Sequence, residues 1–431
     1  MQILEIESVS LEALCQFNAQ RYPFLLESVS HNTNNRYSIL FAHPQQELAL
    51  NNLEDFDFLD ELSSKIPLSN TQHQELPFTG GWFVYLSYEL IGQIEPTLAK
   101  ELHQSSLPVA IAVQIPCTII VDHQLNKTFL LDEDDHSQRM SQVLADIEKI
   151  QPISKANLEG ELTCEANKKF LSGADKIKSY IKAGDVFQVN LSRSWQYTLK
   201  ENCNAVQLYS ALKSTNPAPF SALAQFKDFS IISSSPERLF SVDGKKIETR
   251  PIAGTHPRGD GLEDEALKQR LINHPKERSE HIMLLDLERN DLGRVCEYGS
   301  IEVNEVMALE TYPYVHHIVS NIQGTLKPSM RLEHLVRALF PGGTITGCPK
   351  IRCMQIISEL EQDARGAYTG SLGYVSNNGK MDFNILIRTM IKQEQKLSFR
   401  AGAGIVYDSN PARELEETTH KAQGILKIFS K

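Results

Sequence analysis

The chain has 431 residues, of which 41% are hydrophobic and 23% are charged, so its length allows a large core and roughly two or three domains. Its 43 Lys and Arg residues against 54 Asp and Glu residues give a net charge of -11, which repels nucleic acids and anionic membranes. We therefore expect no nucleic-acid partner. A negatively charged substrate would need a metal ion or a few placed Arg and Lys side chains to reverse the local sign.

The seven cysteines are odd in number and scattered without a C-x-x-C pair, which is typical of reduced cytosolic thiols. Residues 1–17 carry acidic side chains and lack a basic segment followed by an apolar core, so no signal peptide is expected. The longest apolar run, 107–121, is too short to span a bilayer, which needs about 20 residues. These features predict a cytoplasmic protein with no membrane segment.

The N-terminal region, residues 1–150, alternates short strand-like runs with polar turns, as at 37–41 and 81–86. It is predicted to form a sheet-rich lobe. A polar segment over 151–161, which contains Pro and Gly, is typical of a linker and precedes a second lobe over 165–431.

The second lobe begins with a helix predicted over 166–183, which Gly184 ends, and a strand predicted over 186–193. Two more strands, 230–241 and 245–252, follow as a hairpin around an Asp-Gly turn. A Ser-Pro-Glu sequence interrupts the first of these two strands.

The hairpin leads into residues 249–255, with the sequence TRPIAGT. Gly254 can adopt backbone conformations closed to other residues, and Thr255 offers a hydroxyl and an N–H beside it. Two interpretations fit: an ordinary turn between strands, or a place where a ligand approaches the main chain.

The next predicted element is a helix over 275–292 that Gly293 ends. Its first turns carry Glu277 and Glu280, which lie one turn apart and suit oxygen ligation of Mg²⁺. Solvated acids near a helix start are also common, so the pair alone leaves both interpretations open.

A loop at 340–350, with three glycines and two prolines, feeds the following helix. Such a loop is either a structural turn or an anion site at a helix N-terminus. Strands are then predicted at 370–376, 381–391 and 397–407, before a closing helix over 412–429.

Two strand-like runs carry polar groups that could meet a ligand. Arg388 lies among apolar neighbours, where burial is costly unless the guanidinium meets an anion, reaches solvent or pairs with an Asp. His316 and His317 are adjacent in a strand, so one points to each face. One of them is either an acid or base or a hydrogen-bonded core histidine.

The last strand contains Gly402-Ala403-Gly404, where missing side chains expose main-chain N–H groups to a carboxylate or allow tight packing. In the closing helix, Glu417 and Lys421 stand four residues apart and share a face. A surface ion pair explains that spacing as well as a site does.

Taken together and in this order, these motifs resemble the chorismate-utilising enzyme family, which includes anthranilate synthase component I, aminodeoxychorismate synthase component I, and the isochorismate and salicylate synthases. The resemblance covers residues 186–431, with weaker similarity earlier. It implies an α+β fold: a sandwich of two large, mostly antiparallel β-sheets with helices packed outside.

The resemblance also implies roles for individual residues. Glu280 and Glu417, with Glu277 nearby, match the Mg²⁺ ligands. His317 matches the histidine beside the ring of chorismate, and Gly254 with Thr255 matches the segment under the ring carboxylate. The residues that match the substrate-binding set are Thr344, Tyr368, Arg388, Gly402, Ala403, Gly404 and Lys421.

The implied chemistry is consistent with these residues, because chorismate is a dianion whose allylic hydroxyl must leave as a nucleophile adds. Mg²⁺ would neutralise one carboxylate, and Glu237, in the Ser-Pro-Glu sequence, is the candidate acid that protonates the departing oxygen. An amino-acid sensor that has lost catalysis is the non-enzymatic alternative, and the intact set of polar residues argues against it.

The identity of residue 188 separates branches of the family. Water-adding relatives carry a Lys base in the matching strand, whereas this chain has Gln188, which favours ammonia as the nucleophile. Residues 216–221 (NPAPFS), 315–317 (VHH) and 340–347 (FPGGTITG) resemble the branch that makes 4-amino-4-deoxychorismate for para-aminobenzoate and folate.

Ala253 departs from that branch, whose members have a Lys there that is interpreted as a nucleophile on the ring. Anthranilate synthases have Ala at this position. Either ammonia acts here without a lysine adduct or the chain makes anthranilate, and the other motifs favour the first interpretation.

The chain carries no Gly-x-Cys-x-Gly motif of a glutaminase, so the family implies a separate glutamine amidotransferase subunit that delivers ammonia. Residues 24–28 (FLLES) and 36–38 (RYS) resemble the tryptophan pocket of the family. Bound tryptophan is therefore a further expectation, with a pocket formed by Ser28, Arg36, Tyr37 and Ser38.

Overall fold

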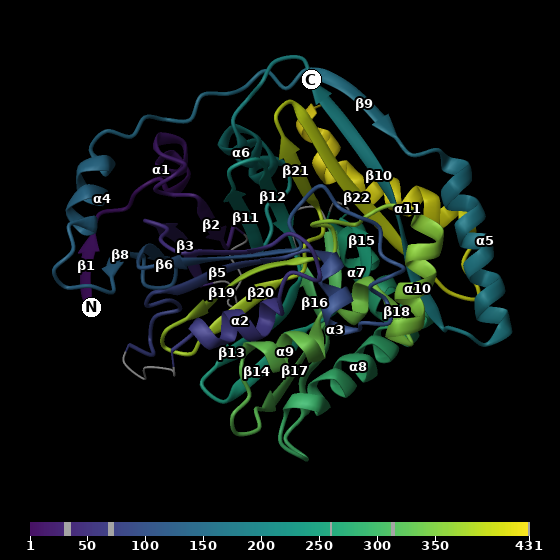
Figure 1. The fold of residues 1–431 in the computed structure, drawn as a ribbon. Helices are drawn as coiled ribbons and strands as arrows, with labels where there is room; N and C mark the ends of the chain where they lie inside the picture. Colours follow the sequence, from purple (N-terminus) through teal and green to yellow (C-terminus); the bar gives the residue numbers. More distant parts are fainter. Residues whose placement is uncertain (30–35, 68–72, 259–260, 312–314, 430–431) are drawn as a thin grey trace.

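A computed structural model describes residues 1–29, 36–67, 73–258, 261–311 and 315–429 (Figure 1). Their strands form a twelve-stranded and a ten-stranded sheet built from antiparallel pairs, so the predicted sandwich of two large sheets is confirmed. No helix in these ranges combines the length and apolarity needed to cross a membrane.

The twelve-stranded sheet runs in the order β1 (Gln2–Ile6), β8 (Lys127–Asp132), β7 (Cys117–Asp122), β3 (Tyr37–Ala42), β2 (Phe24–Glu27), β11 (Phe220–Gln225), β12 (Ser230–Ser235), β21 (Thr389–Gln393), β22 (Lys396–Ile405), β10 (Gln188–Leu199) and β18 (Gly347–Cys348), with β9 (Gly160–Cys164) paired to β10. The ten-stranded sheet runs in the order β15 (Ile252–Pro257), β17 (Val315–Thr325), β14 (Lys246–Arg250), β13 (Arg238–Asp243), β20 (Met381–Asn384), β19 (Ser371–Ser376), β5 (Gly81–Leu86), β6 (Ala110–Ile115) and β4 (Glu47–Leu50), with β16 (Glu302–Thr311) paired to β17.

The helices lie outside the sheets (Figure 1). On the first sheet, α5, α10 and α11 pack against β10 and β22, and α6 packs against β11 and β12. On the second sheet, α8 packs against β15 and β17. The helices are α1 (Leu11–Phe17), α2 (Phe58–Lys65), α3 (Ile91–Ile94), α4 (Arg139–Ile147), α5 (Asn167–Ala183), α6 (Ala205–Thr215), α7 (Leu262–Asn273), α8 (Pro275–Val295), α9 (Leu332–Leu339), α10 (Lys350–Glu361) and α11 (Pro411–Leu426), with short 3₁₀ turns η1 (Tyr88–Leu90), η2 (Gly343–Ile345) and η3 (Lys427–Phe429).

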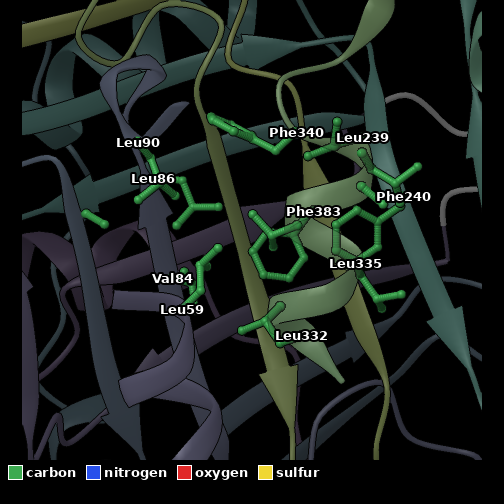
Figure 2. Packing of buried hydrophobic residues seen from close by; sticks show 14 of the residues in the cluster. Leu59, Val84, Leu86, Leu90, Leu239, Phe240, Leu332, Leu335, Phe340 and Phe383 are labelled. Carbon is green, nitrogen blue, oxygen red and sulfur yellow. The ribbon is translucent and has the colours of Figure 1, made fainter. Parts of the chain in front are cut away.

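Strand β5 shows how the alternation of side chains builds the layers. Phe83 and Tyr85 join the core between the two sheets, where Phe83 stacks on Phe24 of the other sheet with ring centroids 4.1 Å apart. Val84 and Leu86 point to the opposite face and pack under the helices. Figure 2 shows this outer core, in which Leu332 and Leu335 of α9 meet Phe240 and Phe383 of the sheet.

Strands from both predicted lobes share each sheet. In the second sheet β5 of the N-terminal region pairs with β19, and in the first β2 pairs with β11. The predicted linker at 151–161 ends in β9, which pairs with β10. The two regions therefore form common cores rather than separate ones.

Three predicted boundaries were wrong. The predicted strand 230–241 divides into β12 of the twelve-stranded sheet and β13 of the ten-stranded sheet. Helix α8 continues past Gly293 to Val295, because Leu292 and Val295 are buried in the outer core. The predicted strand 381–391 is divided: β20 belongs to the ten-stranded sheet and β21 to the twelve-stranded sheet. The chain crosses between the sheets at 385–388, so the apolar run there reflects burial between layers and not one strand.

A buried ion network holds α10 to the first sheet. The Glu361 carboxylate accepts hydrogen bonds from Arg365 at 2.6 Å, from Arg400 at 3.1 Å and from the main chain of Ser192 at 2.8 Å. Burial alone would raise the pKa of Glu361, but the two guanidinium groups hold it below its ordinary value.

We expect Glu361→Gln to destabilise the fold by about 3 kcal/mol or more, because it leaves two buried guanidinium groups without a countercharge. Urea unfolding measures this. Glu359→Gln on the same helix is the control: Glu359 is exposed and accepts a hydrogen bond from the Tyr180 hydroxyl, so its loss should cost less than about 0.5 kcal/mol. Equal losses for both variants would contradict a special role of the network.

Candidate active site

Glu237 and Arg388 lie where the chain crosses between the sheets twice. One crossing joins β12 to β13 through Glu237, and the other joins β20 to β21 through Arg388. The crossings bond to each other: the Ser234 N–H donates to the Arg388 carbonyl at 3.1 Å, and the Ile385 N–H donates to the Glu237 carbonyl at 3.0 Å. Arg388 has a positive φ of 51°, which turns it out of the strand geometry expected from the sequence.

The second element of the site is a bulge in β15. Ala253 pairs with Ile318 of β17 and Thr255 pairs with His317, so Gly254 is the extra residue between them, with φ of 75°. The side chains of Ala253 and Thr255 lie outside the described part of the structure.

His317 is buried against this bulge and is 2% exposed. Its pKa is lowered to about 3, mainly by burial and also by the charges of Arg388 and Lys421, while the Gly254 main chain opposes the shift. The imidazole is therefore neutral at physiological pH. His316 points to the opposite face, where Nε2 lies 2.7 Å from Asp264, so it is the structural member of the pair.

The first turns of α8 bring two carboxylates to the same place. Glu277 lies against Gly254: a Cβ added to Gly254 would be 3.0 Å from Oε2 of Glu277. Glu280 accepts a hydrogen bond from Gln188 Nε2 of β10 at 2.8 Å. The other amide atom, Gln188 Oε1, is buried and has no hydrogen-bond partner within the described residues.

Lys421 of α11 completes the cationic side of the site. Its ammonium donates to the Gly402 carbonyl at 3.1 Å and lies 2.8 Å from Glu417. Burial would lower the pKa of Lys421, but Glu417, together with Glu280, raises it. The two carboxylates therefore act on one ammonium group from different helices.

The glycines of β22 leave room for the side chains that lie across them. A Cβ on Gly404 would lie 2.3 Å from Gln188 Nε2, and one on Gly402 would lie 2.8 Å from the Tyr368 hydroxyl. Any side chain at either position would displace these groups. Ala403 points to the other face, into the core with α5 and α10, so only its main chain faces the site.

The Gly-rich turn η2 places Thr344 beside Glu237. The pKa of Glu237 is raised to about 7, mainly by burial; the charge of Glu288 adds to the rise, and the Thr344 side chain opposes it. A carboxyl group with this pKa holds a proton near neutral pH and can release it, which is the property of a general acid.

The donors near α8 suit a magnesium ion. Within the described residues no group of three or more His, Cys, Asp or Glu side chains is close enough to hold a metal. Mg²⁺ usually takes only one or two protein carboxylates, with water and substrate oxygens completing its shell. Glu280 and Glu417, which both act on the Lys421 ammonium, would supply two such carboxylates.

Three of the four residues predicted for a tryptophan-type pocket line one cavity. Ser28, Arg36 and Tyr37 surround a volume of about 430 Å³ between the sheets. Ser38 does not line it: its hydroxyl is buried on the other face of β3, 2.8 Å from His123. Arg36 is paired with Asp122 at 2.7 Å.

Sequence reasoning missed Asn190. Its Nδ2 donates to the Thr344 carbonyl at 3.1 Å, and its Oδ1 would lie 2.7 Å from a Cβ on Gly402. Asn190 is two residues after Gln188 on one strand, so the period of the strand places both on one face. This two-residue period of the strand was the signal in the sequence that could have identified Asn190.

Comparisons with known proteins identify the family of this chain. Residues 22–427 match the family model of the chorismate binding enzymes. An anthranilate synthase component I-like protein of Synechocystis sp. is 40% identical over 424 residues, covering 95% of this chain and 87% of that protein. Aminodeoxychorismate synthase component 1 of Bacillus subtilis is 41% identical over 370 residues, covering 82% of this chain and 78% of that protein.

The fold comparison leads to the same family. The crystal structure of anthranilate synthase component I from Streptococcus pneumoniae has a TM-score of 0.82 and 33% identity, covering 93% of this chain and 94% of that chain. Relatives named anthranilate synthase and aminodeoxychorismate synthase match this chain at similar identity. What these relatives share is the family. This chain therefore belongs to the chorismate-binding enzyme family.

Proposed function

We propose that this chain aminates chorismate with ammonia to give 4-amino-4-deoxychorismate, the precursor of para-aminobenzoate in folate biosynthesis. The observation that carries the choice of nucleophile is Gln188, in the strand where the resemblance to water-adding relatives implies a Lys base. Its amide is bonded to Glu280 and neither accepts nor releases a proton near neutral pH. Neutral ammonia is a stronger nucleophile than water and needs less activation, so it can act without such a base.

Binding of the dianion falls to a few cationic and main-chain groups. Arg388 and Lys421 offset the net charge of -11 locally, and Gly402 with Gly404 leaves room for the Tyr368 hydroxyl and the Gln188 amide. Neutral His317 can lie against the ring without adding charge. Glu280 and Glu417, with Glu277 nearby, would hold Mg²⁺, which neutralises a substrate carboxylate and withdraws electron density into it.

Glu237 is the group that handles the leaving oxygen in this proposal. As the C–N bond forms and the allylic C–O bond breaks, Glu237 donates its proton and the hydroxyl leaves as water. The added nitrogen then loses one proton, which restores Glu237. The net reaction is chorismate and ammonia to amino-deoxychorismate and water.

A second candidate is anthranilate synthesis, and Ala253 favours it. The family resemblance associates Ala at this position with anthranilate synthases, and relatives with that name match this chain. The motifs at 216–221, 315–317 and 340–347 support the 4-amino product, which we therefore place first.

Two partners belong to the proposal. A separate glutamine amidotransferase subunit would supply ammonia, since the chain lacks a glutaminase motif. The cavity of about 430 Å³ beside Ser28 and Tyr37 would bind tryptophan or a similar amino acid.

The direct test is product identification. The purified chain with Mg²⁺, ammonium and chorismate should give 4-amino-4-deoxychorismate, which a separate lyase converts to para-aminobenzoate. Chromatography and mass spectrometry distinguish it from anthranilate. Turnover without ammonium would indicate water addition, and tryptophan binding without chorismate consumption would indicate a sensor.

We expect Glu280→Gln and Glu417→Gln each to abolish turnover at ordinary Mg²⁺ concentration, because each removes a carboxylate from a site that has few. Activity and direct Mn²⁺ binding, measured over a range of metal concentrations, test this. Glu416→Gln is the control, since Glu416 is exposed on the same helix. Full activity of either site variant would refute the metal assignment.

The pKa of about 7 for Glu237 predicts that kcat/KM falls as pH rises through that value, because the acid must be protonated. The profile should be recorded at constant free ammonia, since ammonia itself titrates at higher pH. Glu237→Gln should lower kcat by roughly 10²–10⁴-fold and remove this alkaline limb. An unchanged limb in the variant would exclude Glu237 as its source.

A further inference from the structure

Glu288 is a buried carboxyl group that the proposed reaction leaves unused. It lies two turns after Glu280 on α8 and is 5% exposed. Its Oε2 accepts from the Thr249 hydroxyl at 3.1 Å, and its Oε1 accepts from the Gly343 N–H at 3.4 Å. One carboxyl group therefore joins the end of β14 to the turn η2.

The carboxyl group of Glu237 lies against the same two segments. It lies close to the main chain of Ile252, three residues after Thr249, and to the side chain of Thr344, directly after Gly343. Glu288 and Glu237 thus lie against the same two segments, the one from the end of β14 into β15 and the turn η2. A shift of either segment would move both groups.

We propose that Glu288 is a positioning residue for Glu237: it fixes the two segments that hold the acid and places a second carboxyl group next to it. This inference rests on the role of Glu237 in the proposed function. Glu288 itself touches neither substrate nor metal in this assignment.

The charges around the pair make its effect specific. Burial raises the pKa of Glu288 to about 7; Asp291 raises it, whereas Lys350, Thr249 and the Gly343 main chain lower it. Lys350 is bonded to Asp291 at 2.5 Å, so much of its charge is already matched. On the other side Lys421 stabilises the ionised form of Glu237, while an ionised Glu288 disfavours it.

Two carboxyl groups that interact in this way lose their protons in sequence, not together. The second ionisation is delayed, so Glu237 keeps its proton to higher pH than it would alone. A carboxyl group that only braces the fold would stabilise the protein without moving this titration.

The decisive variant is Glu288→Gln, which keeps the size of the side chain and removes its charge. We expect the alkaline limb of kcat/KM to move to lower pH by about half a unit or more, with KM for chorismate within about twofold. Glu288→Asp keeps the charge but shortens the reach, so it should retain the limb near its original pH and lower kcat. Asp286→Asn, on an exposed part of α8, is the matched control and should change neither.

A second readout needs no substrate. NMR titration of labelled glutamate carboxyls, with the Glu237 signal identified by its loss in Glu237→Gln, should show a lower pKa for Glu237 in Glu288→Gln. An unchanged pH profile and an unchanged Glu237 titration would overturn the proposal even if the variant unfolds at lower temperature. If the unmodified chain consumes no chorismate, the proposed function fails, whereas the NMR titration still decides whether Glu288 acts on Glu237.

Discussion

The site depends on two places where the chain leaves one sheet and enters the other. Main-chain groups between sheets are away from water, so they must find partners within the protein. Here the crossings at 235–237 and 385–388 supply each other's hydrogen bonds, and the Ser235 hydroxyl adds a bond to the Ile385 carbonyl at 2.5 Å. This mutual satisfaction brings an acid and a guanidinium group to one point between the layers.

A buried ion network supports the other side of the site. Arg365 is held by Glu361, stacks its guanidinium on Tyr368 at 5.5 Å and donates to the Ile345 carbonyl at 3.2 Å. Arg365 therefore links α10, the turn η2 and Tyr368, which is one of the candidate substrate-binding residues. Buried ion pairs add little net stability, but they are costly to break, which restricts the neighbouring groups to one arrangement.

The electrostatics of the site differ from those of the whole molecule. The chain is acidic overall, yet Arg388 and Lys421 converge where Glu277 and Glu280 begin α8. Such an arrangement of mixed charges suits an anionic substrate bound with a divalent cation. Burial then sets the protonation states: His317 is neutral, and Glu237 retains a proton near pH 7.

Local sequence predicted much of the secondary structure. The helical period and Gly184 located α5, which spans Asn167–Ala183 with Gly184 at φ of 86°. The Asp-Gly turn located the hairpin of β13 and β14. These features were readable because a helix stop or a tight turn depends on the conformations open to a few adjacent residues.

The sequence by itself, through its resemblance to a known family, implied the two-sheet class and the identity of the candidate residues. Only the tertiary structure decided that 381–391 divides between sheets, that His316 pairs with Asp264, and that Asn190 and Glu288 lie beside the site. Each of these outcomes depends on partners far apart in the chain, such as Ser235 and Ile385, which are 150 residues apart. Local propensity carries no information about which distant groups will satisfy a buried charge or main-chain polar group.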